Sequence, residues 1–406
     1  MIRLRALIVF LLAMFLICHP AHAQTRTKNS DNEPLILVHY MPWFSAKPIS
    51  DRWGWHWTMN AFDPEKLVDG KPEIAAHLHP LIGPYDSADP HVLEYQLLTM
   101  KMAGISGVIV DWYGLQDHND YAVLHKNTLK LVEQIERLGM KFAICYEDQT
   151  IPVLVKAGKV REEGRVNHAA GEIQWMTENW FQLTSYVQVN QKPLLLSFGQ
   201  TGLTDAEWSK CFEHMKTPVS YLSLHHRRSS AIGAFDWPIP ADALGAYERF
   251  QKESQDWPTA IPVVFPRFVD IYAEAKVGPS YGRVKDDEGK SFRMMLETGL
   301  KSGTPLVQIA TWNDWGEGTI IEPSHEYGYR DLETVQSLVR KHVDRQFTPK
   351  PADLRLPIQI LGARRGPTAN HSKLDEAVRH LMENRPEQAR KILEEMAKPP
   401  ERTQPK

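Results

Sequence analysis

Short apolar runs alternate with longer amphipathic stretches from about residue 34 to residue 345. This repetition is typical of βα units arranged around a parallel sheet. Eight of the apolar runs have the length of strands, and they span Leu35–Tyr40, Ser106–Asp111, Lys141–Tyr146, Lys192–Ser197, Val219–Leu224, Gly233–Asp236, Ile261–Phe265 and Pro305–Thr311. Eight such strands predict an α/β fold, a (β/α)8 TIM barrel, whose catalytic groups lie at the C-terminal ends of the strands.

Helices are predicted between these strands. Pro90–Ala103 has Asp89 before it as an N-cap and a proline at its first position, and Tyr121–Leu138 ends at Gly139. Three further segments have helical periodicity, and they span Gln174–Val187, Asp205–Met215 and Ser291–Ser302. The barrel is therefore expected to occupy residues 34–348.

The composition changes after this barrel. Residues 349–371 contain Pro, Gly and Arg and are predicted to be a linker, and two short amphipathic helices follow, starting near Ser372 and Pro386. They predict a helical hairpin over 372–398, followed by a tail over 399–406. A single helical pair buries its own apolar face poorly, so the hairpin should dock either on the barrel or on a protein partner.

The N-terminal segment has the features of a signal peptide over residues 1–23. Arg3 and Arg5 precede the 13-residue apolar run Ala6–Cys18, and Ala21-His22-Ala23 has the pattern of a cleavage site. The run is shorter than the roughly 20 residues that span a bilayer. The sequence therefore predicts a secreted or periplasmic protein without a membrane anchor after cleavage, with residues 24–33 as a linker to the barrel.

Composition narrows the choice of partners. The formal charge of −3 over 406 residues gives no electrostatic reason to expect nucleic acid as a partner. The chain has 12 tryptophans, which suit binding of flat sugar faces as well as buried cores. Cys145 and Cys211 lie in apolar segments and are predicted to be separate buried thiols. Composition thus makes a sugar one candidate ligand, and the sequence predicts no cofactor.

The segment after the eighth strand carries the most informative chemistry. Asp314 lies between Trp312 and Trp315, and Glu317 follows Asp314 three residues later. Hydrolysis of a glycosidic bond needs one carboxylic acid to protonate the leaving oxygen and a second carboxylate as base or nucleophile. Aromatic neighbours raise the pKa of such an acid. We therefore predict Glu317 as the general acid/base and Asp314 as its partner, in preference to an ordinary surface pair.

Further candidates for substrate binding lie at strand ends, beside the catalytic pair, or in the long aromatic loop that follows the first strand. They are His39, Tyr40, Trp43, Trp55, His56, Asp111, Trp112, Tyr113, Glu147, Asp148, Arg267, Trp312, Asn313, Trp315 and Glu322. His39 could instead be a hydrogen-bonded histidine of the core. Glu147 and Asp148 could instead form a structural ion pair or cap a loop. The run from His225 to Arg228 fits either an acidic sugar or a solvated loop.

The segment Asn313-Asp-Trp-Gly-Glu-Gly318 resembles the signature of the glycoside hydrolase family 71 and 99-like group. The stretches His39–Phe44, Trp53–His56, Gly83–Pro90 and Asp111–Gly114 resemble the same group, so the resemblance covers roughly residues 34 to 345. It implies a barrel that hydrolyses glycans, so we predict an oligosaccharide or polysaccharide as the substrate. Family 99 contains endo-acting α-mannosidases, and family 71 contains α-1,3-glucanases.

The signature combines features of both families. Family 99 implies Glu and His where this chain has Asp314 and Gly316, and the Asn-Asp pair is more similar to family 71. The continuation Gly318–Pro323 is more similar to family 99. The family 99 resemblance implies that the first carboxylate deprotonates the sugar 2-hydroxyl and that Glu317 acts as acid and then base. An inverting enzyme would instead use the first carboxylate to activate water.

Two other classes of function remain possible on the sequence alone. The first is a catalytically inactive carbohydrate-binding barrel in which Asp314 has replaced the residue that the chemistry needs, and whose hairpin recruits a partner. The second is a metal-dependent hydrolase that uses His39, Asp111 and Glu147. The chain lacks an H-E-x-x-H motif, which disfavours the metal-dependent class.

Overall fold

The computed structural model describes residues 33–199, 201–367 and 369–397. The predicted signal peptide, residues 24–32 of the predicted linker and the predicted tail lie outside these residues. Within the described ranges, no helix combines the length and the apolar character that crossing a membrane requires.

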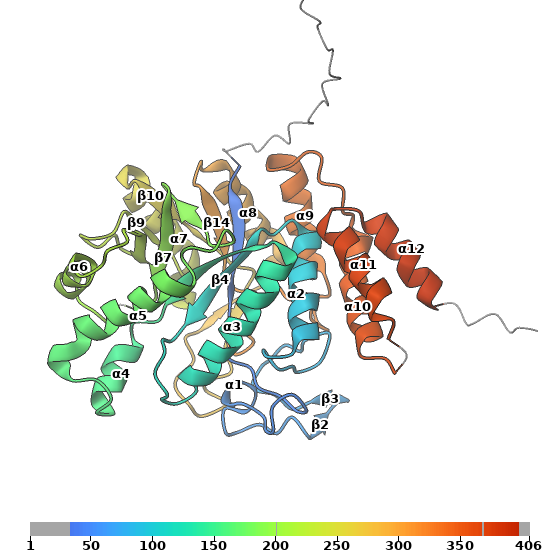
Figure 1. The fold of residues 1–406 in the computed structure, drawn as a ribbon, viewed down its shortest axis with the longest axis horizontal. Coiled ribbons are helices and arrows are strands. Elements are labelled where there is room, and N and C mark those ends of the chain that lie inside the picture. The colour runs from blue at the N-terminus through green and yellow to red at the C-terminus, as the bar shows by residue number, and fades with distance from the viewer. Residues whose placement is uncertain (1–32, 200, 368, 398–406) are drawn as a thin grey trace, which may run out of the picture. The chain divides into compact units, whose positions relative to one another are not determined.

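Parallel strands form a nearly closed barrel (Figure 1). In chain order they are β1 (Leu35–Tyr40), β4 (Gly107–Trp112), β5 (Lys141–Tyr146), β7 (Lys192–Ser197), β8 (Ser220–Leu224), β9 (Gly233–Phe235), β10 (Thr259–Ile261), β11 (Val263–Val264) and β14 (Leu306–Ile309). β10 pairs with β9 and β11 pairs with β14, and only Pro262 separates the two. Because proline has no N–H for a ladder, β10 and β11 are one interrupted strand, and the predicted TIM barrel is confirmed.

Side chains alternate between the barrel interior and the surrounding helices. Leu37, Ile109 and Cys145 belong to a cluster inside the barrel, whereas Val38 and Val110 pack against the helices. Successive residues of a strand point to opposite faces. A residue at a strand end therefore reaches the mouth of the barrel if it lies an even number of positions from an inward-facing residue of its strand. Otherwise its side chain reaches the helical layer.

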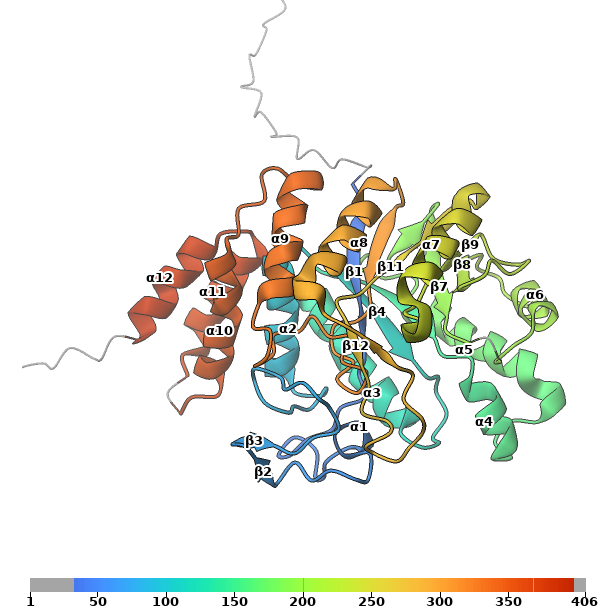
Figure 2. The same cartoon turned by 180° about the vertical axis from the view of Figure 1, so that it is seen from behind.

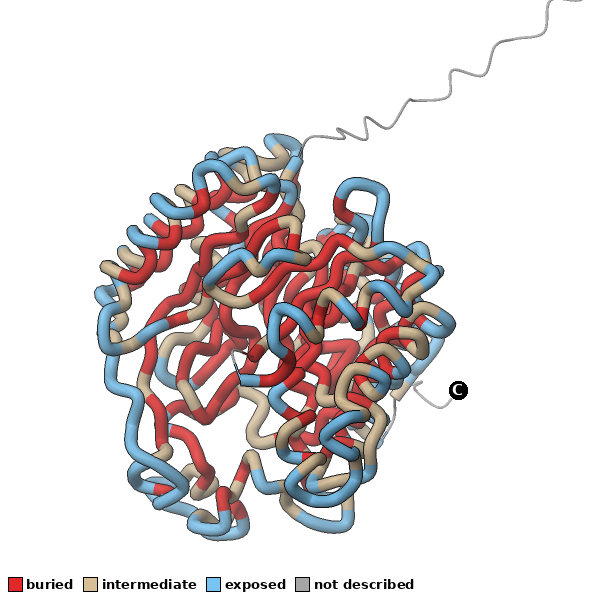
Figure 3. Tube along the Cα trace, turned by 90° about the vertical axis from the view of Figure 1, so that its left-hand side faces the viewer, coloured by how far each residue is buried: buried red, intermediate tan, exposed pale blue. Residues whose placement is uncertain are grey.

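Helices surround the barrel, and exposed residues concentrate on their outer faces (Figure 3). They are α2 (Pro90–Ala103), α3 (Tyr121–Leu138), α4 (Thr150–Lys156), α5 (Arg165–Asn179), α6 (Asp205–Glu213), α7 (Ala243–Glu253), α8 (Lys290–Lys301) and α9 (Arg330–His342). The view from behind shows α8 and α9 over the side of the barrel that holds β1 and β11 (Figure 2). α2 and α3 have the predicted bounds, and Asp89 caps α2 by accepting a hydrogen bond from the His91 N–H at 2.9 Å.

Short elements fill the connections. They are α1 (Trp55–Thr58), the antiparallel pairs β2 (Leu67–Val68) with β3 (Lys71–Pro72) and β12 (Phe268–Val269) with β13 (Arg283–Val284), the strand β6 (Gln188–Val189), and 3-10 turns at Glu162–Gly164, Pro240–Asp242, Ser254–Asp256, Asp287–Gly289 and Pro351–Arg355. The loop that contains α1, β2 and β3 covers the end of the barrel at which the strands finish (Figure 1).

The predicted helix Gln174–Val187 is wrong. α5 begins earlier and ends at Asn179, and the residues that follow approach the sheet. Val187 and Val189 lie inside the barrel, and β6 pairs antiparallel with the start of β7. Pairing with the sheet has therefore overridden the helical periodicity of this segment.

The predicted linker 349–371 is wrong over its middle part, because α10 (Leu356–Arg364) lies within it. Leu356 and Ile360 are buried, and α10 packs against α2. Arg364 forms a buried ion pair with Glu94 of α2, with Nε 2.9 Å from Oε1. A proline in its first turn and flanking arginines made this short helix resemble a linker.

α11 (His371–Met382) and α12 (Pro386–Ala397) form the predicted helical hairpin. Leu374, Leu381 and Ala389 are buried, and the pair packs on α10 and α2 (Figure 1). Of the two predicted docking surfaces, the hairpin thus uses the barrel of its own chain.

Replacing Ile360 with alanine should lower the free energy of unfolding by about 2–5 kcal/mol, because it leaves a cavity between α10 and the barrel. Denaturant unfolding followed by circular dichroism measures the change. Gln359→Ala, on the exposed side of the same helix, is the matched control. Equal stabilities of the two variants would show that α10 does not belong to the core.

Candidate active site

Two adjoining cavities lie at the C-terminal ends of the strands. The first, of about 370 Å³, is lined by His39, Met41, Trp43, Asp111, Tyr113, Tyr121, Glu147, Gln149, Thr150, Val153, Phe198, Trp237, Tyr272, Asp314 and Glu317. The second, of about 340 Å³, is lined by Trp43, Trp55, His56, Met59, Tyr113, Tyr272, Val277, Gly278, Pro279, Tyr281, Asp314 and Gly316. Asp314, Trp43, Tyr113 and Tyr272 line both cavities, which therefore form one cleft.

The structure brings nine of the predicted site residues into this cleft. They are His39, Trp43, Trp55, His56, Asp111, Tyr113, Glu147, Asp314 and Glu317. His39, Asp111 and Glu147 each lie two residues beyond the interior residues Leu37, Ile109 and Cys145, so they continue the inward-facing parity of their strands. The strand-end rule therefore located a real cluster.

The segment that contains Asp314 and Glu317 is a tight turn after β14. The Glu317 N–H donates to Asp314 Oδ1 at 3.1 Å, and the Asp314 N–H donates to Thr311 Oγ1 at 2.8 Å. Gly318 has φ of +67°, and a Cβ there would lie 2.8 Å from the Val269 side chain. Glycine at this position allows the turn to pack against β12 and to hold both carboxyl groups at the cleft.

Burial gives the two catalytic candidates different acidities. It raises the pKa of Asp314 to about 7, although the backbone N–H groups of Glu317 and Gly316 oppose the rise. Burial raises the pKa of Glu317 well above its usual range, and the Asp314 carboxylate raises it further. Asp314 therefore ionises first, and its charge makes Glu317 keep its proton to higher pH, which is the division between base and acid that glycoside hydrolysis uses.

Tyr272 touches the general acid candidate. Its hydroxyl donates to Glu317 Oε1 at 3.3 Å, which favours the ionised form and lowers the pKa of Glu317. The sequence analysis missed Tyr272, because it lies in the loop between β12 and β13, away from a strand end. The length of this loop and its aromatic residues Tyr272 and Tyr281 are the signals that could have identified it.

Replacing Tyr272 with phenylalanine should raise the pKa of Glu317, because the hydrogen bond to the carboxylate is lost. The acid then stays protonated to higher pH, so the alkaline limb of the pH profile of kcat/KM should move upward. Tyr281→Phe is the matched control for the position of this limb, since Tyr281 packs edge-on against Tyr272 with ring centroids 5.6 Å apart. If the alkaline limb does not move in Tyr272→Phe, the result contradicts the hydrogen bond from Tyr272 to Glu317.

His39 is a neutral group of the cleft. Its Nε2 lies 2.8 Å from Gln308 Oε1, and burial lowers its pKa to about 4. Gln308 donates from Nε2 to the Asp236 carbonyl at 2.6 Å, so its oxygen is free to accept and Nε2 of His39 carries the proton. The edge of Trp237, a cleft residue that follows the sixth predicted strand and was missed, lies against this imidazole.

Aromatic rings form the walls of the cleft. Trp43 stacks on His56 with ring centroids 4.2 Å apart, and His56 Nε2 lies 3.1 Å from Asp120 Oδ2. Trp55 is 42% exposed at the second cavity, where Tyr281 and Val277 are also exposed. Apolar faces of this kind stack on sugar rings.

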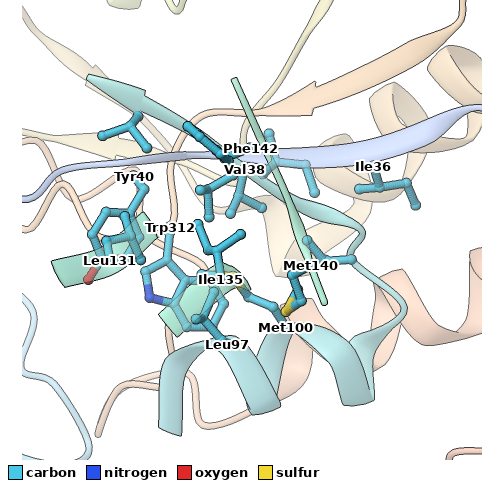
Figure 4. Close-up of a cluster of buried hydrophobic side chains, with 14 of the residues drawn as sticks. Ile36, Val38, Tyr40, Leu97, Met100, Leu131, Ile135, Met140, Phe142 and Trp312 are labelled. Atoms are coloured by element: carbon cyan, nitrogen blue, oxygen red, sulfur yellow. The ribbon is translucent and has the colours of Figure 1, made fainter. Parts of the chain in front are cut away.

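Three predicted binding residues are instead part of the core. Tyr40 and Trp312 lie among the side chains between the sheet, α2 and α3 (Figure 4). Trp112 is fully buried and stacks on Trp175. Tyr40 and Trp112 follow His39 and Asp111 directly, so the alternation of strand faces turns them toward the helices.

Three more predicted residues hold the segment that contains Asp314 and Glu317 and do not line the cleft. Trp315 Nε1 and Asn313 Nδ2 both donate to the Tyr85 hydroxyl, at 3.3 Å and 3.1 Å. Tyr85 donates in turn to Glu322 at 2.7 Å, and Gln96 donates to the other Glu322 oxygen at 2.7 Å. The predicted substrate contacts of Asn313, Trp315 and Glu322 are therefore internal hydrogen bonds.

Asp148 and Arg267 are also structural. Asp148 accepts hydrogen bonds from the Leu203 N–H at 2.9 Å and from Trp208 Nε1 at 3.1 Å. Arg267 forms buried ion pairs with Asp286 and Asp331. Neither residue lines the two cavities, so the predicted substrate contacts of both fall outside the cleft. Oδ1 of Asp148 is buried without a hydrogen-bond partner among the described residues.

The basic run contributes no cation to either cavity described above. His225 pairs with Asp236, and Arg228 donates to the carbonyls of Leu203 and Gly199. His39, Asp111 and Glu147, the candidates for a metal site, do share the first cavity, but the described residues contain no group of three donors arranged to hold a metal ion.

The fold and the cleft define a TIM barrel with a pair of carboxyl groups at its catalytic end. No family model matches the chain. Curated relatives share distant similarity. The chain is 20% identical over 321 residues to a glycoprotein endo-alpha-1,2-mannosidase-like protein of Danio rerio, covering 71% of this chain and 70% of that protein. It is 21% identical to the Homo sapiens protein of the same description, covering 66% of this chain and 62% of that protein.

Solved structures are similar in fold. The GH99 endo-alpha-mannosidase from Bacteroides thetaiotaomicron superposes with a TM-score of 0.58 at 17% identity, covering 77% of this chain and 98% of that one. A structure described as a glycoside hydrolase-like protein superposes with a TM-score of 0.52 at 12% identity. The resemblance to the family 99-like group that the motifs indicate is therefore confirmed, as distant sequence similarity and as a shared fold.

Proposed function

We propose that this protein is a glycoside hydrolase that cleaves a glycan, with Glu317 as the general acid/base and Asp314 as its partner. The observation that carries the proposal is the pair itself. Two neighbouring carboxyl groups with different acidities lie in an aromatic cleft at the catalytic end of a barrel.

An internal glycosidic bond is the proposed point of cleavage. Asp314 lines both cavities, so sugar units can occupy the cleft on either side of it. Trp43 and Tyr113 continue from one cavity to the other and offer apolar faces along the chain of sugars. The names of the relatives make an α-mannosidic linkage the first one to test.

Two routes are open to Asp314 in this cleft. In the first, Asp314 takes the proton of the sugar 2-hydroxyl as the 2-oxygen attacks the anomeric carbon, and Glu317 protonates the leaving oxygen. Glu317 then takes a proton from water, which attacks the anomeric carbon and breaks its bond to the 2-oxygen, while Asp314 returns the proton to the 2-oxygen. Two displacements at the anomeric carbon give retention of configuration. In the second route Asp314 activates water directly, and the single displacement gives inversion.

A substrate screen tests the proposal. Protein starting at Gln24 is incubated with α-mannans, α-1,3-glucan and other polysaccharides, product size separates endo from exo cleavage, and NMR of the first products gives the anomeric configuration. The double variant Asp314→Asn/Glu317→Gln is the control. Cleavage that the double variant retains would contradict the catalytic pair. Binding without cleavage by the native protein would favour a carbohydrate-binding barrel.

Export is the proposed route of the protein to its glycan. The arginines, the apolar run and Ala21-His22-Ala23 support cleavage after Ala23. Expression of the whole chain in a bacterium with a working secretion pathway should give a product outside the cytoplasm that begins at Gln24. N-terminal sequencing checks this, and a cytoplasmic product that retains Met1 would contradict it.

A further inference from the structure

Two carboxyl groups of the cleft take no part in the proposed reaction. Asp111 is the last residue but one of β4, and Glu147 directly follows β5. The register pairs Asp111 with Cys145, two residues before Glu147. Side chains two residues apart point to the same face of a strand. Both carboxyl groups therefore reach into the first cavity from neighbouring strands.

These carboxyl groups are buried with few partners. Asp111 is 6% exposed, and no group in the described part of the chain donates a hydrogen bond to its carboxylate. Glu147 is 8% exposed, and one of its oxygens accepts from Gln149 Nε2 at 2.8 Å. Its other oxygen has no donor among the described residues. Both side chains line the cavity, so a ligand that enters it can donate to these unpartnered oxygens.

Among the side chains that the structure describes, the cleft gathers four carboxyl groups without a compensating cation. Asp314 and Glu317 line the same cavity, and among the described residues that line either cavity there is no lysine or arginine. Burial keeps His39 neutral, with its pKa lowered to about 4. Each carboxyl group that ionises makes ionisation of its neighbours more costly, so a cationic ligand is favoured over an anionic one.

We propose that Asp111 and Glu147 bind the ammonium group of an amino sugar, so that the glycan cleaved in this cleft carries a free amino group. The substrate part of this inference rests on the proposed glycosidase function. The binding part concerns the two carboxyl groups alone.

An ammonium group matches this pair better than a hydroxyl group does. Burial, with the neighbouring carboxylates, raises the pKa of Asp111 to about 8 and the pKa of Glu147 well above its usual range. An ammonium group offers three N–H donors, a positive charge and no acceptor, so it stabilises the ionised, acceptor-only form of both groups. A hydroxyl group donates once and brings lone pairs toward the carboxylates, and an N-acetyl group has no charge. The rings of Tyr113 and Tyr121, with centroids 5.3 Å apart, line the same cavity and can stabilise a cation further.

Calorimetric titration tests this binding with defined sugars. The Glu317→Gln protein is titrated with glucosamine, galactosamine and mannosamine, with the N-acetyl form of each, and with glucose, galactose and mannose. At least one amino sugar should bind about 10- to 100-fold more tightly than its neutral parent and its N-acetyl form, as a hydrogen bond to a charged group implies.

Variants assign the preference to the pair. Asp111→Asn and Glu147→Gln, each added to the Glu317→Gln protein, should remove the preference for the amino sugar. The matched control is Asp256→Asn, which removes an exposed carboxylate before β10, at the opposite end of the barrel, and should keep the preference. Circular dichroism verifies that each variant is folded.

The outcomes separate this inference from the proposed function. Amino sugars that bind no more tightly than their neutral parents, or a preference that survives both cleft substitutions, would overturn the inference. Glycan cleavage that Glu317→Gln abolishes, without any preference for amines, would leave the proposed function standing. A preference for amines in a protein that cleaves no polysaccharide would keep the ammonium site and overturn the proposed function.

Discussion

Replacing Glu317 with glutamine should lower kcat on the natural glycan by about 10²- to 10⁴-fold, the usual contribution of a general acid. An activated aryl glycoside with a good leaving group needs little protonation of the leaving oxygen. Its turnover should therefore fall much less in the variant, provided that the cleft accepts it. Initial rates on both substrates, measured side by side, check this difference.

The pH profile gives a second measurement on the same variant. Burial and the Asp314 carboxylate raise the pKa of Glu317, so its deprotonation forms the alkaline limb of kcat/KM. That limb should disappear in Glu317→Gln. Glu136→Gln, on the exposed face of α3, is the matched control and should keep the native profile. Equal losses on the glycan and on the aryl glycoside would contradict the role of Glu317 as the proton donor.

Replacing Asp314 with asparagine should also lower kcat by about 10²- to 10⁴-fold, because the base that activates water or the sugar hydroxyl is lost. The loss should be similar on the natural glycan and on the aryl glycoside, since neither reaction proceeds without that base. The pKa of Asp314 is about 7, and its carboxylate is the active form. Activity of the native protein should therefore fall as the pH drops below about 7, and this acid limb should be absent in Asp314→Asn.

The comparison of the two variants is decisive for the pair. A loss in Asp314→Asn that is restored on the aryl glycoside would assign proton donation to Asp314 and reverse the two roles. Near-native rates in both variants, on a substrate that the native protein cleaves, would make the pair structural.

Periodicity predicted the barrel well, because burial of apolar side chains is a local property of each strand and helix. The strand-end rule predicted the site only in part. It selects a position along a strand but does not say which face of the sheet the side chain points to. It therefore grouped His39 with Tyr40 and Asp111 with Trp112. Alternation along the strand, applied from Leu37 and Ile109 onward, separates the cleft residue from the core residue in each pair.

Other features depend on contacts between distant parts of the chain. Tyr272 reaches Glu317 from a loop 45 residues earlier, and Arg267 finds its two carboxylate partners 19 and 64 residues away. Nothing near Arg267 in the sequence distinguishes a sugar-binding arginine from one that pairs internally. α10 was missed for a related reason, since its apolar residues become a core only against α2.

Asn313 acts as an additional rung of the barrel ladder. Its side-chain oxygen accepts from the Met41 N–H at 2.8 Å, and its side-chain nitrogen donates to the Met41 carbonyl at 3.0 Å. One amide thus imitates a neighbouring strand beyond the last backbone pairing of β1 and β14. Trp43 and Asp314 are thereby carried on a single rigid frame with a fixed spacing. Divergence in linkage preference among related barrels is then expected in the segments outside that frame, such as 147–153 and 270–281.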